Sequence, residues 1–225
     1  MSSAGGDASN LLIRSAATVV IVRPGRGLEI LMVKRSRKLA FMPDLWVFPG
    51  GRVDDGDRAI AAAEGREPFR VAAARETQEE VALRLDGAED DLVEIACWVT
   101  PRGETRRYHT RFFLAHVGEH AEVTPDASEI VEVTWLSPAL ALDAHRAGRL
   151  PLAPPTWWTL FEMQSISSVA EALAWARGRT PQSLAPIEPT RSSVEGRPTV
   201  RWGADRGLHL VQVDGRAFWE PIAGS

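Results

Sequence analysis

The segment that begins at Pro68 carries the pattern that most limits how this chain can fold. A proline followed by a long run without helix breakers predicts an α-helix over residues 68–82. At 100° per residue, Glu76, Glu79 and Glu80 fall within an arc of about 100° on that helix. The opposite face carries apolar side chains at Val71, Ala74, Val81 and Ala82. Such a helix is expected to pack its apolar face on a sheet and to hold three carboxylates together on the other side.

The three carboxylates lack an obvious neutralising partner. Like charges three or four residues apart on a helix repel, each pair costing a few tenths of a kcal/mol. Lys34 and Lys38 are the only lysines in the sequence, and neither lies in this segment. Carboxylate oxygens at this density suit a hard divalent cation such as Mg2+ or Mn2+. A solvated charge run on a surface helix is the alternative interpretation of this segment alone.

The motif Phe48-Pro49-Gly50-Gly51 lies upstream of the acidic helix. Paired glycines let a backbone approach a ligand closely and expose its N–H groups, as phosphate-binding loops require. By itself the motif could be a plain turn. A glycine pair followed by several spaced acids favours a site for a phosphate and a metal ion.

The remaining pattern predicts an α+β fold, because the strands do not alternate regularly with helices. Strands are expected over 17–24, 28–35, 92–101, 108–117 and 129–138, with an extended segment over 41–51. The acidic, alanine-rich stretch 52–66 reads as an insertion with one short helix. Residues 1–13 are expected to form a flexible leader and 14–138 the main domain. Residues 139–225 should form a mainly helical extension, packed on the same domain, with helices near 139–149, 155–163 and 168–177, a proline-rich link and a terminal hairpin.

Composition narrows the class of protein. The chain has 225 residues, with 26 Lys+Arg against 30 Asp+Glu and a formal net charge of −4. This balance argues against nucleic acid as a partner. The single cysteine excludes an intrachain disulfide and a zinc site built from several cysteines. No apolar run approaches a membrane span, and the N-terminus does not resemble a signal peptide. We therefore expect a cytoplasmic enzyme or binding protein with no membrane partner, which could form a homodimer.

The acidic segment resembles the signature of the Nudix hydrolases, G-x5-E-x7-R-E-U-x-E-E-x-G-U, where U is bulky and aliphatic. The matching residues, in order, are Gly51, Glu67, Arg75, Glu76, Glu79, Glu80 and Leu83. Fifteen residues rather than five separate Gly51 from Glu67, so about ten are inserted. Thr77 replaces the aliphatic residue and Ala82 replaces the glycine. Because the left-handed conformation that such an exit can use is costly for alanine, the second replacement bears on the geometry of the helix exit more than on the chemistry.

The resemblance implies a Nudix-type α/β/α sandwich with a mixed sheet, and metal-dependent hydrolysis of a diphosphate bond in a small nucleotide-type substrate. It implies that Glu76, Glu79 and Glu80 bind Mg2+ or Mn2+ and that Arg75 orients a glutamate. Gly50 and Gly51 would lie beside the diphosphate. Glu67 would be structural or a peripheral ligand. The resemblance leaves open the general base and the number of metal ions.

A second motif points to the substrate. Some coenzyme A-cleaving members carry L-L-T-x-R-(S/A)-x3-R-x3-G-x3-F-P-G-G, and Leu31, Arg35, Ser36 and Phe48–Gly51 fit it, whereas Ala40 and Asp44 depart from it. The chain is similar to the peroxisomal coenzyme A diphosphatase subgroup and its bacterial relatives. Coenzyme A or acyl-coenzyme A is therefore the favoured substrate, bound in part by Arg35. The alternatives are ADP-ribose, a nucleotide sugar or a dinucleotide, and a non-catalytic nucleotide-binding module.

Several further residues allow two interpretations. Arg107, with Arg102 and Arg106, could bind substrate phosphates or belong to an exposed loop. Glu129 and Glu132 could supply an extra ligand or base. Trp157 and Trp158 are expected to pack in the core rather than stack on a base. The acids at Asp54, Asp55 and Asp57 are expected to lie on the surface of the insertion.

Overall fold

The computed structural model describes residues 12–85, 91–203 and 205–222, so almost all of the predicted leader 1–13 lies outside the described residues. Its elements in chain order are β1 (Ile13–Gly25), β2 (Gly27–Arg35), β3 (Trp46–Val47), β4 (Gly50–Arg52), α1 (Asp55–Glu64), α2 (Pro68–Val81), β5 (Val93–Val99), β6 (Arg107–His116), β7 (Ile130–Leu136), α3 (Pro138–Arg146), α4 (Pro154–Met163), α5 (Val169–Arg177), β8 (Thr190–Val194), β9 (Arg197–Trp202), β10 (Arg206–Val213) and β11 (Arg216–Pro221). In this part of the chain, each helix is too short or too polar to cross a membrane.

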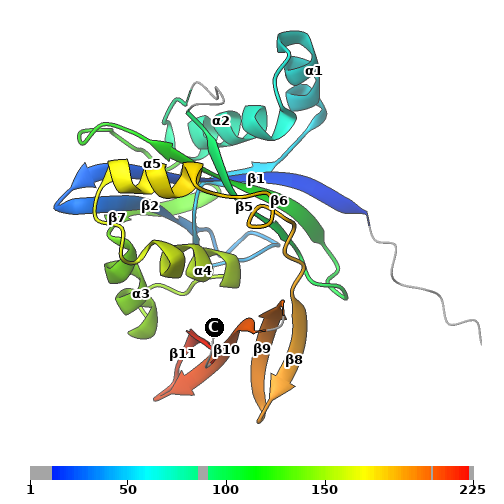
Figure 1. The fold of residues 1–225 in the computed structure, drawn as a ribbon, viewed down its shortest axis with the longest axis vertical. Coiled ribbons are helices and arrows are strands. Elements are labelled where there is room, and N and C mark those ends of the chain that lie inside the picture. Colours follow the sequence, from blue (N-terminus) through cyan, green and yellow to red (C-terminus); the bar gives the residue numbers. More distant parts are fainter. Residues whose placement is uncertain (1–11, 86–90, 204, 223–225) are drawn as a thin grey trace, which may run out of the picture.

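A mixed sheet forms the middle layer, with strand order β3-β2-β1-β6-β5, β4 beside β1 and β7 beside β2. Strand β1 runs parallel to β6 and antiparallel to β2. Helices α1 and α2 lie on one side of the sheet, and α3, α4 and α5 on the other (Figure 1). The predicted α/β/α sandwich is therefore confirmed. Because both faces of β1 are covered, Val19 and Val20 are both fully buried although they point to opposite sides.

Helix α2 occupies the predicted segment, but its buried face differs from the expected one. Thr77, Glu80 and Val81 are buried together, whereas Ala82 is exposed. The helix contacts both β1 and β4, so its buried surface extends round to the side that carries the glutamates. Thr77 fits this buried position because its hydroxyl donates to the Ala73 carbonyl at 2.8 Å.

The exit of α2 keeps the geometry that a glycine would allow. Ala82 is the C-cap residue, with φ 57° and ψ 21°, and its N–H donates to the Gln78 carbonyl. The replacement of glycine by alanine therefore leaves the exit geometry unchanged, because alanine takes the left-handed conformation in spite of its side chain. The cost of this conformation for a residue with a Cβ atom is about 1–2 kcal/mol.

The extension contains the three predicted helices, followed by more strand than expected. Strands β8 to β11 form a four-stranded antiparallel sheet, where the sequence suggested a proline-rich link and one hairpin. All residues of Thr190–Val194 in β8 are exposed, so this edge strand lacks the alternation of apolar and polar residues that identifies a strand. Trp157 and Trp158 lie in the core as predicted.

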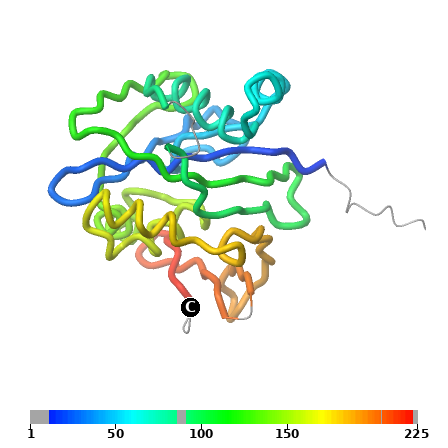
Figure 2. Tube along the Cα trace, turned by 45° about the horizontal axis from the view of Figure 1, so that its top comes forward, coloured from blue at the N-terminus to red at the C-terminus, as the bar shows by residue number. Residues whose placement is uncertain are grey.

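The terminal sheet lies beside the helical part of the extension (Figure 2). It packs on the same body through aromatic rings and one histidine. The Trp202 ring of β9 contacts the rings of Trp98 and Trp158 edge-on, at 5.0 and 4.8 Å between centroids. His145 of α3 is buried, and its Nδ1–H donates to the Leu150 carbonyl at 2.9 Å. Its Nε2 accepts the Trp219 N–H of β11 at 2.8 Å. A neutral imidazole therefore joins α3 to the terminal sheet.

Replacing Ala82 by glycine is expected to raise the free energy of unfolding by about 1 kcal/mol, because glycine adopts φ near 57° without the Cβ penalty. Urea unfolding measures the change. The control is Ala74→Gly within the same helix, which should lower the free energy of unfolding by about 1 kcal/mol. A glycine at 82 that destabilises the protein as the control does would contradict the prediction.

The stability of the protein should fall on acidification through His145. Burial lowers the pKa of this imidazole below its ordinary value of 6.5, so the unfolded chain binds the proton first. The contribution of neutral His145 is fully present above the unfolded pKa of 6.5 and is lost as the pH falls from there through the lower folded pKa. Urea unfolding at several pH values should show a shallower acid loss for His145→Gln than for wild type. Parallel curves would refute this role.

Candidate active site

The glycine pair places backbone directly against the acidic helix. Gly50 and Gly51 of β4 pair with Thr18 and Ala17 of β1. A Cβ on Gly50, whose φ is +151°, would lie 2.2 Å from the Ala17 carbonyl oxygen. A Cβ on Gly51 would lie 2.3 Å from the carboxyl carbon of Glu76. Only glycine leaves room at both positions, so the helix and the strand meet at these two residues.

Glu80 is the most buried of the three glutamates, with 6% of its side chain exposed. The Gly50 N–H donates to its Oε2 at 2.8 Å, and the Arg35 guanidinium lies 3.9 Å from its Oε1. Burial raises the pKa of Glu80 to about 8, although the Gly50 N–H opposes that rise. A cation near this carboxylate would favour its charged form.

Glu76 and Glu79 lie progressively closer to solvent, with 17% and 58% of their side chains exposed. Burial raises the pKa of Glu76, and the charges of Glu79 and Glu129 add to that rise. Arg75 contacts both glutamates, at 3.0 Å from Glu76 Oε1 and 2.8 Å from Glu79 Oε2. The predicted orienting role of Arg75 agrees with these contacts.

Asp57 supplies the main partner of Arg75, and the expectation that it lies on the insertion surface is wrong. Its side chain has no exposed area, and its two oxygens accept from Arg75 Nε and Nη2, both at 2.9 Å. These hydrogen bonds raise the pKa of Arg75 above its ordinary value. Asp57 also closes a capping box with Asp54 at the start of α1. The Asp54-x-x-Asp57 spacing was the sequence signal for the capping box.

Asp57 also changes which residue matches the first acid of the signature. Five residues separate Gly51 from Asp57, which is the spacing of the first acid in the signature. Glu67 instead caps α2, accepting from the Phe69 N–H at 3.1 Å, and pairs with Arg111 at 2.9 Å. The structure thus assigns Glu67 a structural role and places the inserted residues after Asp57.

Arg35 is fixed between the acidic cluster and the loop 36–45. Its Nε–H donates to the Phe41 carbonyl oxygen at 3.4 Å, and its Nη1 lies 3.9 Å from Glu80 Oε1. In the same loop Asp44 has φ 59° and pairs with Arg37 at 3.0 Å. The departure of Asp44 from the coenzyme A motif therefore retains the left-handed backbone that a glycine would adopt there.

The other predicted residues divide between the site and its surroundings. Glu129 is close enough for its charge to raise the pKa of both Glu76 and Glu80. Glu132 instead lies 3.8 Å from Lys34. The Arg107 guanidinium is 8% exposed and is held by Glu188 at 2.5 Å and by the Thr100 carbonyl at 3.0 Å. The structure therefore groups Glu129 with the acidic cluster, and pairs Arg107 with the extension.

The residues present fit a divalent cation. Within the described ranges, no group of three Asp, Glu, His or Cys side chains converges closely enough to hold a metal ion as it stands. Arg75 accounts for this, because it holds Glu76 and Glu79 against its own guanidinium. The carboxylates of Glu76 and Glu80 still meet the glycine backbone, and both have raised pKa values. All-oxygen donors of this charge suit Mg2+ or Mn2+.

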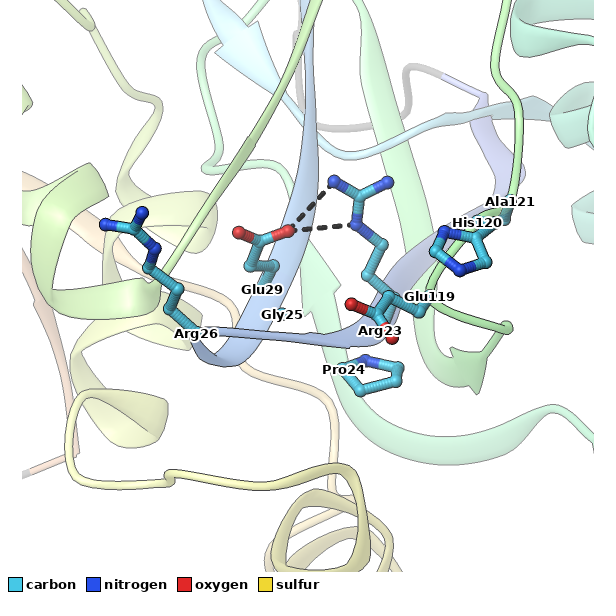
Figure 3. A pocket seen from close by; sticks show the side chains of 8 residues that line it. All are labelled: Arg23, Pro24, Gly25, Arg26, Glu29, Glu119, His120 and Ala121. Carbon is cyan, nitrogen blue, oxygen red and sulfur yellow. Dashed lines mark hydrogen bonds and ion pairs between the residues drawn. The ribbon is translucent and has the colours of Figure 1, made fainter.

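A separate surface hollow of about 580 Å3 lies at the turn between β1 and β2 (Figure 3). Arg23, Arg26, Glu29 and His120 line it, and Arg23 pairs with Glu29 at 2.9 Å. None of the predicted site residues belongs to this lining. The hollow is therefore distinct from the acidic cluster.

The chain is similar in sequence to known proteins. The chain is 28% identical over 191 residues to the Caenorhabditis elegans protein called putative nudix hydrolase 7, covering 70% of this chain and 62% of the relative. It is 32% identical over 121 residues to human acyl-coenzyme A diphosphatase NUDT19, covering 53% and 30%. The chain thus spans less than two thirds of the length of these relatives.

A crystal structure of a NUDIX hydrolase from Alicyclobacillus acidocaldarius superposes with a TM-score of 0.63 at 24% identity, covering 72% of this chain and 96% of that one. This likeness concerns the fold. A family model described as NUDIX domain matches residues 12–154, well over half of the chain. The chain therefore belongs to the Nudix hydrolases, whose common reaction is the hydrolysis of diphosphate bonds.

Proposed function

We propose that this Nudix hydrolase cleaves the diphosphate of coenzyme A or acyl-coenzyme A, giving 3',5'-ADP and a 4'-phosphopantetheine. The observation that carries the proposal is the meeting of Glu76 and Glu80 with the Gly50–Gly51 backbone beside Arg35. This places carboxylates, backbone and a fixed guanidinium together, as the positioning of a diphosphate requires.

The chemistry follows from charge and position. Glu76, Glu79 and Glu80 would hold the divalent cation, which polarises phosphoryl oxygens and lowers the pKa of an attacking water. Arg75 neutralises the carboxylates of Glu76 and Glu79, so a cation held by these residues would compete with its guanidinium. Arg35 would contact a phosphate from the side opposite Phe41. A carboxylate of the same cluster would take the proton from water.

Two observations favour coenzyme A as the substrate. The segment Leu31–Gly51 keeps most of the coenzyme A motif, and Asp44 retains a glycine-like backbone where the motif has glycine. The similarity to human acyl-coenzyme A diphosphatase NUDT19 is the second support. ADP-ribose, nucleotide sugars and dinucleotides remain the competing substrates, because they present the same diphosphate to the same cluster.

A substrate panel tests the proposal. Purified protein with Mg2+ or Mn2+ should release 3',5'-ADP from coenzyme A and acetyl-coenzyme A faster than it releases AMP from ADP-ribose, as measured by product chromatography. EDTA should abolish the activity. Turnover of ADP-ribose with coenzyme A untouched would refute the substrate, and no turnover of any diphosphate would favour a non-catalytic binding module.

The same assay tests the metal ligands. Glu79→Gln and Glu80→Gln should each lower kcat by more than about 100-fold, beyond the loss typical of residues that only support the ligands. The matched control is Glu64→Gln on α1, an exposed glutamate paired with Arg66, whose activity should equal wild type. Full activity in both α2 variants would contradict the assignment of these glutamates as metal ligands.

Substitutions of Arg35 and Arg107 should have different effects, the first on substrate binding and the second on stability. Arg35→Gln should raise KM for coenzyme A about tenfold, because a charge-assisted contact with phosphate is lost. Arg107→Gln should leave KM unchanged and lower the free energy of unfolding by about 1–3 kcal/mol, since it removes the donor to the Thr100 carbonyl and the closer of the two arginines that pair with Glu188. Initial-rate kinetics and urea unfolding of both variants measure these effects. A tenfold KM increase in Arg107→Gln would restore it as a substrate ligand.

A further inference from the structure

The connection before β7 carries a tight turn, residues 126–130, built around one carboxylate. Asp126 Oδ1 accepts the Ile130 N–H at 2.7 Å, and its Oδ2 accepts the Glu129 N–H at 3.0 Å and the Ser128 N–H at 3.3 Å. The Ser128 hydroxyl also donates to Oδ2. Ala127 has φ 63°, a left-handed conformation that alanine disfavours. The Asp126 contacts hold the backbone in this shape.

The turn is attached to the acidic cluster from two sides. The Asp126 N–H donates to the Glu80 carbonyl at 3.0 Å, which joins the turn to the end of α2. The Ser36 N–H donates to the Glu129 carbonyl at 2.7 Å, and Ile130 pairs with Arg35 across β2 and β7. The Glu129 backbone is therefore held between the helix that carries Glu80 and the strand end that carries Arg35.

The position of Glu129 has an electrostatic consequence. Its charge raises the pKa of both Glu76 and Glu80, so it adds to a cluster that already repels itself. Glu129 is exposed, and among the described residues no ion pair involves it. Glu132, three positions after Glu129, pairs with Lys34 instead. The turn thus holds one carboxylate near Glu76 and Glu80, and among the described residues no ion pair neutralises it.

We propose that Asp126 is a positioning residue that holds Glu129 at the cation-binding side of the cluster formed by Glu76 and Glu80. The inference rests on the proposed function, because it requires that the cluster bind a divalent cation. Asp126 itself does not touch the substrate. It orders three successive backbone N–H groups, and this fixes the direction in which the Glu129 side chain leaves the turn.

Mn2+ binding tests the proposal without turnover. Glu129→Gln should weaken Mn2+ binding about tenfold, the lower end of the effect of residues that support a metal site. Asp126→Ala should weaken it to a similar extent because the turn is lost. Asp126→Asn keeps one acceptor oxygen and should give an intermediate loss. Isothermal titration calorimetry of the full chain measures each dissociation constant.

A double-mutant cycle shows whether Asp126 acts through Glu129. In the Glu129→Gln background, Asp126→Ala should cause no further loss of Mn2+ affinity. With coenzyme A as substrate, the single variants should lower kcat at fixed Mn2+ and leave KM unchanged. Additive losses in the cycle would overturn the positioning role, since they would mean that Asp126 acts on the helix end directly.

The chain offers a matched control for charge. Glu132→Gln removes the same charge from an exposed residue three positions along, and it should leave Mn2+ affinity unchanged. An equal loss in Glu132→Gln would overturn the proposal, because long-range charge would then explain the effect. A wild-type protein that binds no Mn2+ would overturn both the metal site and this inference. Mn2+ binding that depends on Asp126, without hydrolysis of coenzyme A, would overturn only the substrate.

Discussion

The contact between the Gly50–Gly51 backbone and the carboxylates of Glu76 and Glu80 is the constraint on which the rest of the site depends. A side chain at either glycine would occupy space that Glu76 or the Ala17 carbonyl already fills. The N–H of Gly50 pays part of the cost of burying Glu80, and burial still raises the pKa of that carboxyl to about 8. The close approach of strand and helix therefore creates both the shape and the unusual charge state of the cluster.

Arg75 distributes the negative charge that this contact concentrates. It binds the fully buried Asp57 with two hydrogen bonds and reaches Glu76 and Glu79 with its remaining donors. The planar guanidinium suits this role, because its donors point in fixed directions. The three glutamates then differ in exposure along one helix, from nearly buried Glu80 to exposed Glu79. Residues of identical chemistry thus differ in burial and in freedom to move.

Much of the fold could be predicted from periodicity, because β1, β2, β5, β6, β7 and helices α2 to α5 follow apolar patterns and proline boundaries. The strand β8 could not, since all its residues are polar or exposed and its pairing partner lies across a turn. In the site, too, residues grouped by local spacing could be predicted, whereas contacts between distant segments could not. Glu76, Glu79 and Glu80 were evident from their spacing on one helix. Asp57 stands at the signature spacing from Gly51, but its contact with Arg75, 18 positions away, depends on the fold, as does the contact of Asp126 with Glu80, 46 positions away.

By itself, the sequence determined the element types, the grouping of three carboxylates on α2 and the family to which the chain belongs, because these depend on local periodicity and on motif spacing. Only the tertiary structure decided which acid pairs with Arg75, that Glu80 is buried, and that Arg107 pairs with Glu188. Burial and ion pairing depend on which segments meet in space. It also showed that Ala82 and Asp44 adopt glycine-like backbone conformations, since surrounding contacts outweigh the local preference of one residue.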